Sequence, residues 1–373
     1  MTCFEARFSQ GFAEGLLRVK LIGMKALLLS DYSQLNLVDA PLPDLAADEI
    51  LLRVEACGIC GSDVHGYDGS SGRRIPPIIM GHEAAGVIAQ VGPQVGDEWR
   101  VGDRVTFDST LYCGRCEYCL KGDINLCTNR QVFGVSCKDY RRNGAFAEYL
   151  AVPTRVLHRL PPELSFTEAA MIEAVSVALH AVVVSQFRRG ETALVLGAGM
   201  IGSLIIQALR IAGASHIFVA DPDKSRVEAA KRSGAHTSIR LSTDGSGPTA
   251  AQVIFESYPE GVNHVFEAVG FGATVQAAID AVQKGGTVTL VGNIDAEVKL
   301  PLQSVVTRQI RLQGSAASAG EYPRAIELLA SKQIDVSPLI SAVEPLSRGA
   351  QAFDRLYRRE PNLIKIILKP DLN

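Results

Sequence analysis

The sequence predicts an α/β protein with two domains, a mostly β domain followed by one with a doubly wound parallel sheet. Three observations support this. The length of 373 residues exceeds what one ordinary core organises. Short strand-like and turn-like segments continue up to about residue 170. From about residue 190, apolar strands alternate regularly with helices, which is typical of a parallel sheet.

The composition is that of a soluble globular protein, with 47% hydrophobic and 21% charged residues. The net charge of −3, without a basic patch, argues against nucleic acid and anionic membranes as partners. No apolar run is long enough to span a bilayer. Residues 1–23 carry Glu5 and Glu14 and lack a continuous apolar core, so we expect a loosely attached extension rather than a secretory signal.

The first domain begins with strand patterns. Residues 25–29 read as a strand, and residues 50–56 alternate well enough for a second one. Short strands and turns continue through residues 86–92 and 102–105. The second of these strands delivers Cys60 at its end.

Cys60 and the downstream pair His82 and Glu83 are the candidate chemical centre. Each has a structural alternative: a small buried thiol, a hydrogen-bonded loop histidine and a solvated carboxylate. Together, a thiolate, an imidazole and carboxylates make a strong site for a divalent metal, most plausibly zinc. Glycines on both sides suit tight loops that bring the donors together.

A second metal motif follows in the spacing C-x2-C-x2-C-x7-C, formed by Cys113, Cys116, Cys119 and Cys127. Four thiolates can surround one tetrahedral zinc and leave no open position, which indicates a structural site rather than a redox pair or free thiols. The site should fix a lobe over residues 109–130. Cysteines crowded in this way fit metal ligation in a reducing cytosol better than disulfides.

A helical stretch is expected over residues 167–180. Glu173 is a carboxylate within its almost entirely apolar run, and burial there is costly unless a cation or hydrogen-bond donors meet it. Glu173 is therefore a candidate metal-site carboxylate. The alternative is a buried glutamate whose carboxylate is satisfied by backbone amides.

The second domain opens with a buried strand over residues 191–196 and the turn G-x-G-x-x-G over residues 197–202. The candidate cofactor-binding residues in this turn are Gly197, Gly199, Met200, Ile201 and Gly202. An apolar helix follows directly. Glycines in this turn permit the sharp bend, the close approach of a pyrophosphate and tight helix packing, while the helix N-terminus faces the phosphates. Strand, turn and helix are all in place, which strengthens an otherwise weak motif.

The next strand, residues 216–220, ends in Asp221. A carboxylate there accepts hydrogen bonds from the adenosine ribose and repels a 2′-phosphate, so the sequence predicts NAD rather than NADP. Asp221 could also cap the following helix. Arg226 is the opposing signal, because its side chain could reach an adenine-side phosphate.

Further strands at residues 262–268 and 287–292 complete the sheet, and their ends, including Val269 and Val291, should lie near the nicotinamide. A helix is expected over residues 323–331. The final strand, residues 364–368, should return to the first domain.

With these motifs in hand, the chain resembles the zinc-dependent medium-chain dehydrogenases from Met24 to the C-terminus, and within them the sorbitol (polyol) dehydrogenase branch, with threonine dehydrogenases as close relatives. The resemblance rests on Cys60-Gly61-Ser62-Asp63, Gly81-His82-Glu83, the four cysteines, the glycine turn, and Glu173 followed by Ser176-Val177. It implies a GroES-like catalytic domain over residues 24–175 and 316–373 and a Rossmann NAD-binding domain over residues 176–315.

The resemblance also implies residue roles. Cys60 and His82 would ligate a catalytic zinc, with Glu83 and Glu173 alternating as ligand or holding its water, and Asp63 would orient the His82 ring. The zinc would lower the pKa of a substrate hydroxyl. Ser62 would then take the proton and pass it through His65 while NAD accepts hydride.

Substrate and assembly are expectations of the same kind. The implied substrate is a small-molecule alcohol or polyol, and the implied assembly is a cytoplasmic homo-oligomer, a dimer or a tetramer. The polar anchors of the animal sorbitol dehydrogenase pattern are missing, because Gly66 stands in place of a tyrosine and Ala316-Ala317-Ser318 in place of an arginine and tyrosine. A smaller alcohol, another sugar or a diol would fit, and threonine 3-dehydrogenase and a non-catalytic nucleotide-binding protein are the alternatives.

Overall fold

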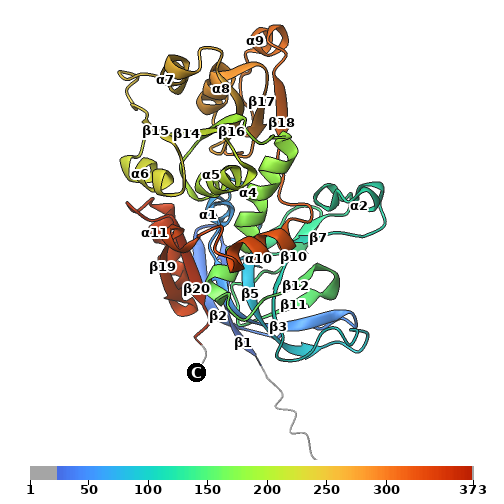
Figure 1. The fold of residues 1–373 in the computed structure, drawn as a ribbon. Coiled ribbons are helices and arrows are strands. Elements are labelled where there is room, and N and C mark those ends of the chain that lie inside the picture. Colours follow the sequence, from blue (N-terminus) through green and yellow to red (C-terminus); the bar gives the residue numbers. More distant parts are fainter. Residues whose placement is uncertain (1–22, 372–373) are drawn as a thin grey trace, which may run out of the picture.

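The computed structural model describes residues 23–371. The predicted N-terminal extension, apart from Gly23, lies outside the described residues. Figure 1 shows two lobes, one built mainly of β-strands from both ends of the chain and the other of helices around a parallel sheet. The predicted fold class is confirmed. Within residues 23–371, no helix is both long and apolar enough to cross a membrane.

The β lobe is built on a seven-stranded sheet in the order β12-β6-β5-β3-β20-β19, with β11 paired to β3. Its strands are β3 (Glu49–Gly58), β5 (Glu83–Val91), β6 (Arg104–Phe107), β11 (Tyr149–Pro153), β12 (Leu157–Arg159), β19 (Ile340–Pro345) and β20 (Lys365–Lys369). The last strand returns to this lobe as expected, with Ile367 of β20 opposite Gly58 of β3. The site residues at the end of β3 therefore lie beside the C-terminal strand.

Smaller elements complete the β lobe. A three-stranded sheet holds β1 (Met24–Asp31), β2 (Gln34–Ala40) and β4 (Ile78–Ile79), and two short ladders hold β7 (Thr110–Leu111) with β8 (Gln131–Val132) and β9 (Val135–Ser136) with β10 (Arg141–Arg142). The helices are α1 (Gly61–Tyr67), α2 (Glu117–Lys121) and α11 (Gly349–Tyr357). The 3-10 turns are η1 (Ile124–Leu126), η2 (Thr154–Val156), η3 (Ser337–Leu339) and η4 (Leu346–Arg348). Buried aliphatic and aromatic side chains between the two larger sheets form the core of this lobe.

The second lobe holds a six-stranded sheet in the order β15-β14-β13-β16-β17-β18, and every neighbouring pair is parallel. Its strands are β13 (Thr192–Leu196), β14 (His216–Asp221), β15 (Thr237–Arg240), β16 (Val262–Glu267), β17 (Val282–Leu290) and β18 (Arg311–Gly314). Its helices are α5 (Met200–Ala212), α6 (Lys224–Arg232), α7 (Ala250–Ser257), α8 (Gly272–Ala281) and α9 (Leu302–Thr307). The order reverses at β13, which places the crevice of a doubly wound sheet at the end of that strand.

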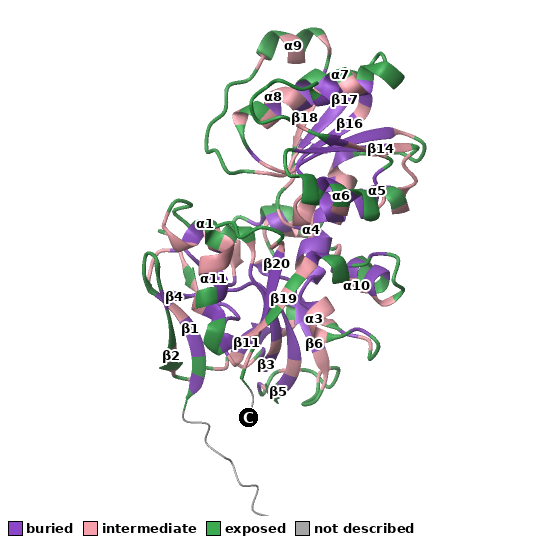
Figure 2. Ribbon diagram, turned by 90° about the vertical axis from the view of Figure 1, so that its left-hand side faces the viewer, coloured by how far each residue is buried: buried purple, intermediate pink, exposed green. Residues whose placement is uncertain are grey.

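Two packed helices lie where the lobes meet, α4 (Ile172–Ser185) and α10 (Tyr322–Ala330), and Figure 2 shows α4 largely buried there. The single helix expected over residues 167–180 is wrong. The chain forms α3 (Phe166–Ala169) first, and the amide of Met171 then donates to the carbonyl of Glu168 three residues back, which ends the first helical turn. The domain boundary expected after residue 175 falls inside α4.

Candidate catalytic metal centre and cofactor site

Cys60 stands between β3 and α1. It follows β3 closely and is the N-cap residue of α1, with extended backbone angles. The segment after Cys60, where the glycines suggested a tight loop, continues directly into a helix. The thiol of Cys60, the imidazole of His82 and the carboxylate of Glu83 offer ligand atoms that all lie within 4.8 Å of one another. The structure thus brings together three of the four residues predicted for the catalytic metal.

Gly81 shapes the turn that delivers His82. Its φ of +94° lies in the left-handed region, where a side chain is strained, and an added Cβ would lie 2.8 Å from a ring atom of Phe146. Directly after His82, Glu83 begins β5 and lies opposite Gly58 of β3. Strand pairing therefore fixes Glu83 next to the chain segment that carries Cys60.

Asp63 lies behind His82. Its Oδ1 is 3.4 Å from His82 Nδ1, and its Oδ2 accepts the Cys60 amide at 3.3 Å. Burial alone would raise the pKa of Asp63, but His82 and the guanidinium of Arg74 together hold that pKa well below its ordinary value. The carboxylate is therefore ionised, and it can orient the His82 ring in the way expected of it.

Glu83 has a partner that the sequence analysis missed. Lys365 of β20 is 1% exposed, and its Nζ donates to Glu83 Oε2 and, at 2.9 Å, to the carbonyl of Ile59. Burial alone would lower the pKa of Lys365, but the neighbouring Glu83 carboxylate and Cys60 raise it. Gly58 provides the space for the Glu83 carboxylate, since a Cβ at position 58 would lie 2.3 Å from Glu83 Oε2. A lone lysine within the apolar strand 364–368 was the signal available in the sequence.

Glu173 lies near this centre without joining the close group of three. Its Oε1 accepts a hydrogen bond of 3.4 Å from Ser109, and the side chain is half-buried at the start of α4. Burial is the main cause that raises the pKa of Glu173 to about 7, with His82 opposing the shift and Glu83 adding to it.

The two residues predicted for proton transfer, Ser62 and His65, lie on α1 and are both exposed. Arg74 is a second residue that the sequence analysis missed. It is 4% exposed, and its Nη2 lies 3.4 Å from Ser62 Oγ and 2.9 Å from Asp63 Oδ1. The pair Arg73-Arg74 after a glycine-rich loop was a weak signal, because most arginines in loops are solvated.

The donor set at this centre fits zinc. A thiolate, an imidazole and a carboxylate are the ligand types that zinc accepts, and three protein ligands leave a position for water or substrate. Glu83 Oε1 is buried and has no hydrogen-bond partner among the described residues, which is costly unless a cation meets it. The residues present therefore suit a catalytic zinc.

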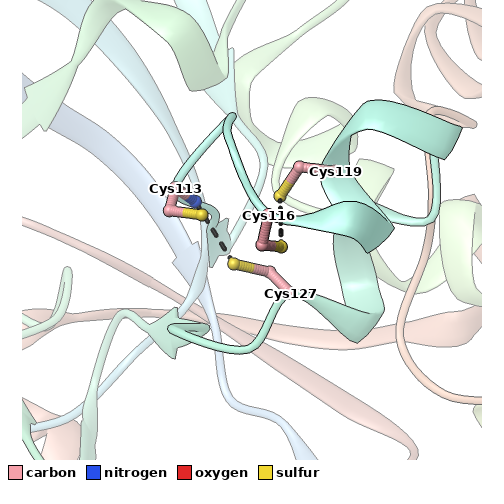
Figure 3. A group of neighbouring side chains, drawn as sticks. All are labelled: Cys113, Cys116, Cys119 and Cys127. Atoms are coloured by element: carbon pink, nitrogen blue, oxygen red, sulfur yellow. Dashed lines mark hydrogen bonds between the residues drawn. The ribbon is translucent and has the colours of Figure 1, made fainter.

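The four clustered cysteines surround a second centre, shown in Figure 3. Their Sγ atoms all lie within 4.8 Å of one another, with Cys116 and Cys119 3.5 Å apart, and none forms a disulfide. Hydrogen bonds from the backbone, first at Cys119 and then at Thr128, lower the pKa of Cys116 to about 5. Four cysteine Sγ atoms gathered in this way fit a tetrahedral structural zinc, whose four protein ligands leave no position open for water or substrate.

The loop that carries the four cysteines, residues 109–130, is anchored to the rest of the molecule at Asn125. Asn125 Nδ2 donates to the carbonyl of Ala316 at 2.7 Å and lies 3.3 Å from His180 Nε2 on α4. The other ring nitrogen of His180 lies 2.8 Å from Glu321 Oε1. The segment Ala316-Ala317-Ser318, noted for its missing polar anchors, is thus held by its backbone.

The glycine turn lies between β13 and α5. Gly197 has φ +92°, and a Cβ on Gly202 would lie 1.9 Å from the carbonyl oxygen of Gly197, so both positions require glycine. A Cβ on Gly199 would meet nothing within 4 Å. Gly199 is the N-cap of α5 and offers no side-chain acceptor to the first amides, at Met200 and Ile201. An open turn at a helix N-terminus with uncapped amides fits a dinucleotide pyrophosphate.

Asp221 ends β14 and is buried. Its Oδ2 accepts the amide of Ala198 in the glycine turn, and its Oδ1 accepts the amide of Asp223, both at 2.8 Å. The suggestion that Asp221 caps the next helix is wrong: Asp223 is the N-cap of α6 and accepts the amides of Ser225 and Arg226. The Asp221 carboxylate instead holds the glycine turn through the amide of Ala198.

The strand ends expected near the nicotinamide lie beside this turn. A Cβ on Gly197 would lie 2.6 Å from Val269 Cγ2, so Val269 packs directly against it. The amide of Val291 donates to the carbonyl of Glu267 at 2.9 Å, which places Val291 beside the end of β16. Both valines therefore lie just past the carboxyl ends of β16 and β17, on the side of the sheet where the glycine turn follows β13.

Two protein families match the chain. The alcohol dehydrogenase GroES-like domain matches residues 46–162, and the zinc-binding dehydrogenase family matches residues 201–331. Together they cover both lobes.

Curated relatives match along nearly the whole chain. Sorbitol dehydrogenase of Bacillus subtilis (strain 168) is 33% identical over 352 residues, covering 93% of this chain and 98% of the relative. L-idonate 5-dehydrogenase of Vitis vinifera is 34% identical over 353 residues, covering 90% of this chain and 93% of the relative.

Solved structures share the fold. An Escherichia coli oxidoreductase/dehydrogenase of unknown specificity has a TM-score of 0.87 at 29% identity, covering 94% of this chain and 100% of its own. A Sinorhizobium meliloti 1021 zinc-binding dehydrogenase bound to NADP has a TM-score of 0.82 at 29% identity, and an alcohol dehydrogenase from E. coli CFT073 complexed with NADH has 0.85 at 29%. Each covers 93% of this chain and 99% of its own.

Proposed function

Because the chain belongs to the zinc-binding alcohol dehydrogenase family, we propose that it oxidises a secondary alcohol of the polyol, sugar or diol class to a ketone, with NAD as hydride acceptor. The gathering of Cys60, His82 and Glu83 at one point carries the proposal. The names of the relatives, sorbitol and L-idonate dehydrogenase, support the substrate class.

In this proposal Cys60 and His82 would hold the catalytic zinc, with Glu83 and Glu173 as the carboxylates that complete its surroundings. Zinc would supply a Lewis acid that favours loss of the hydroxyl proton, and NAD the hydride acceptor. Asp63 would keep the His82 ring oriented through Nδ1. Lys365 would neutralise the side of Glu83 that faces away from the metal.

The proton would leave through α1. Ser62 is exposed at the start of this helix, two residues after the thiol of Cys60, and can accept the proton of a substrate hydroxyl while it releases its own. His65 lies on the exposed side of the same helix and would pass the proton to water.

The cofactor would lie across the glycine turn. Gly197, Gly199 and Gly202 would admit its pyrophosphate next to the amides of Met200 and Ile201. Asp221 would accept the ribose hydroxyls and disfavour NADP, with Arg226 on α6 the opposing cation. Val269 and Val291 would border the nicotinamide. Solved relatives bound to NADH and to NADP show that the fold alone does not decide between these cofactors.

The remaining assignments are proposals of the same kind. A structural zinc would be held by Cys113, Cys116, Cys119 and Cys127. The catalytic domain would comprise residues 24–175 and 316–373, and the NAD-binding domain residues 176–315. We propose a cytoplasmic homo-oligomer, a dimer or tetramer, joined along β18. That strand is an edge of the parallel sheet, and α9 exposes Leu302 and Val306 beside it in sequence.

The test is NAD reduction by the purified protein over polyols, aldoses, small diols and threonine, with NADP in parallel and a zinc-stripped control. Turnover of one secondary alcohol that disappears on zinc removal and returns on zinc addition is the expected result. Turnover of threonine alone would favour the threonine 3-dehydrogenase alternative, and no turnover with zinc and NAD bound would contradict the proposal.

A further inference from the structure

One guanidinium holds two consecutive residues of the candidate site. Arg74 donates to Asp63 Oδ1 from Nε at 3.3 Å and from Nη2 at 2.9 Å, and the same Nη2 lies 3.4 Å from Ser62 Oγ. Its Nη1 donates to the carbonyl of Arg73 at 3.1 Å. Arg74 is only 4% exposed and Asp63 is fully buried, so the guanidinium is held in the interior and reaches the exposed Ser62 from beneath.

Gly66 gives this arginine its space. A Cβ on Gly66 would lie 2.1 Å from Arg74 Cγ and 2.9 Å from Arg74 Cβ. The φ of Gly66 lies outside the left-handed region, so the backbone does not require glycine at this place in α1. The reason for glycine is room, and any side chain at position 66 would displace Arg74.

The contact fixes how Ser62 can hydrogen-bond. A guanidinium has only donors, so Arg74 occupies one lone pair of Ser62 Oγ. The second lone pair is left for a substrate hydroxyl, and the serine's own proton must point elsewhere. A fixed positive charge beside Oγ also stabilises negative charge that develops near it.

We propose that Arg74 is a positioning residue of this enzyme: it holds Ser62 Oγ in the orientation that receives the substrate's hydroxyl proton, and Gly66 supplies the room. The inference rests on the proposed function. In this step the substrate O–H bond breaks and an O–H bond forms on Ser62, while Ser62 releases its own proton outward toward His65 or water. Arg74 stays protonated throughout, and the hydride electrons pass to NAD.

The primary variant is Arg74→Met, with Arg73→Met as the matched control because Arg73 is exposed. In zinc-loaded protein, Arg74→Met should lower kcat by about tenfold or more, which is part of the roughly 10²–10⁴-fold that assisted proton transfer contributes. The KM for NAD should be unchanged. Arg73→Met should stay within about twofold of wild type. Arg74→Lys should not restore kcat, because an ammonium lacks the planar fork that reaches Asp63 and Ser62 together.

A second variant displaces Arg74 without removing it. Gly66→Ala should lower kcat by itself, and it should lower it no further in the Arg74→Met background, because both changes remove the same contact. If Arg74→Met fails to fold, Arg74→Lys and Gly66→Ala carry the test with the same readouts.

A binding readout complements the kinetics. Methylguanidine at millimolar concentration should raise the Tm of zinc-loaded Arg74→Ala and leave the wild-type Tm unchanged, because only the variant has an empty guanidinium position. A kcat of Arg74→Met within about twofold of wild type, or fully additive losses from Gly66→Ala and Arg74→Met, would overturn the inference. Wild-type turnover is measured first. Its absence would overturn the proposed function, whereas the variant results above bear only on the role of Arg74.

Discussion

Lys365 and Glu83 form a buried ion pair between residues 282 positions apart in the chain, directly beside Cys60 and His82. The pair joins β20, at the end of the chain, to the start of β5. The carbonyl of Ile59 binds the same ammonium at 2.9 Å, so the segment that leads to Cys60 is held as well. The C-terminal strand is therefore part of the candidate catalytic centre.

Removing the cation of this pair should destabilise the protein. In Lys365→Met the Glu83 carboxylate is left buried without its partner, which costs about 3–5 kcal/mol of unfolding free energy. The control is Lys332→Met, which breaks an exposed pair with Glu168 and should cost less than about 1 kcal/mol. Urea unfolding at pH 7 measures both, and equal losses would contradict a central role for Lys365.

The four-cysteine centre should bind its own metal. Cys119→Ser should lower the zinc content from about two ions per chain to about one, because tetrahedral structural sites need all four ligands. The loop over residues 109–130 should then be cut faster by a protease. Cys137→Ser, a cysteine outside the group, should change neither quantity. Loss of both zinc ions in Cys119→Ser would contradict two independent sites.

Asp221 should set the cofactor preference. Asp221→Ser should lower the ratio of kcat/KM for NAD to that for NADP by about tenfold or more, as expected for loss of hydrogen bonds to a charged acceptor. The control Asp223→Ala removes the N-cap of α6 and should cost about 0.5–2 kcal/mol of stability while leaving the cofactor ratio unchanged. An unchanged ratio in Asp221→Ser would remove Asp221 from cofactor recognition.

The burial of His158 should make the folded protein less stable in acid. Burial lowers the pKa of His158 to about 4, where its ring stacks on Tyr322 with centroids 5.1 Å apart. The unfolded chain takes up the proton near pH 6.5, so the stabilising contribution is complete above that pH and is lost as the pH falls toward 4. The loss at pH 4.5 should be about 2 kcal/mol. His158→Phe should show a smaller fall in unfolding free energy between pH 7 and 4.5; an identical fall would exclude His158.

The fold class and the grouping of Cys60, His82 and Glu83 could be predicted from the sequence, because each follows from a simple physical constraint. The βα alternation after residue 190 has one favoured arrangement, a parallel sheet, and Gly197 and Gly202 are required by the turn itself. Cys60 and the His82-Glu83 pair were recognisable because sulfur, imidazole and carboxylate together suit few roles other than metal binding. The helix predicted over residues 167–180 is interrupted, because the Met171 amide bonds to a carbonyl three residues back and ends the first helix. Periodicity cannot locate such a break within a continuous apolar run.

The roles of Arg74 and Lys365 could not be predicted from the sequence. Each is a cation whose partner is set by tertiary contacts: Lys365 meets Glu83 only because β20 returns beside β3, and Arg74 meets Ser62 only because Gly66 leaves room. A charge in the apolar strand 364–368 indicates a buried partner without naming it.

The most direct test of the central claim is the fate of the carbinol hydrogen. A secondary alcohol that the protein oxidises is deuterated at the reacting carbon and converted in a single turnover with NAD, and the reduced cofactor is analysed by mass spectrometry. We predict one deuterium in the reduced nicotinamide and an equimolar ketone, both abolished in Cys60→Ser. Reduced cofactor without deuterium, or full transfer in Cys60→Ser, would contradict hydride transfer at this centre.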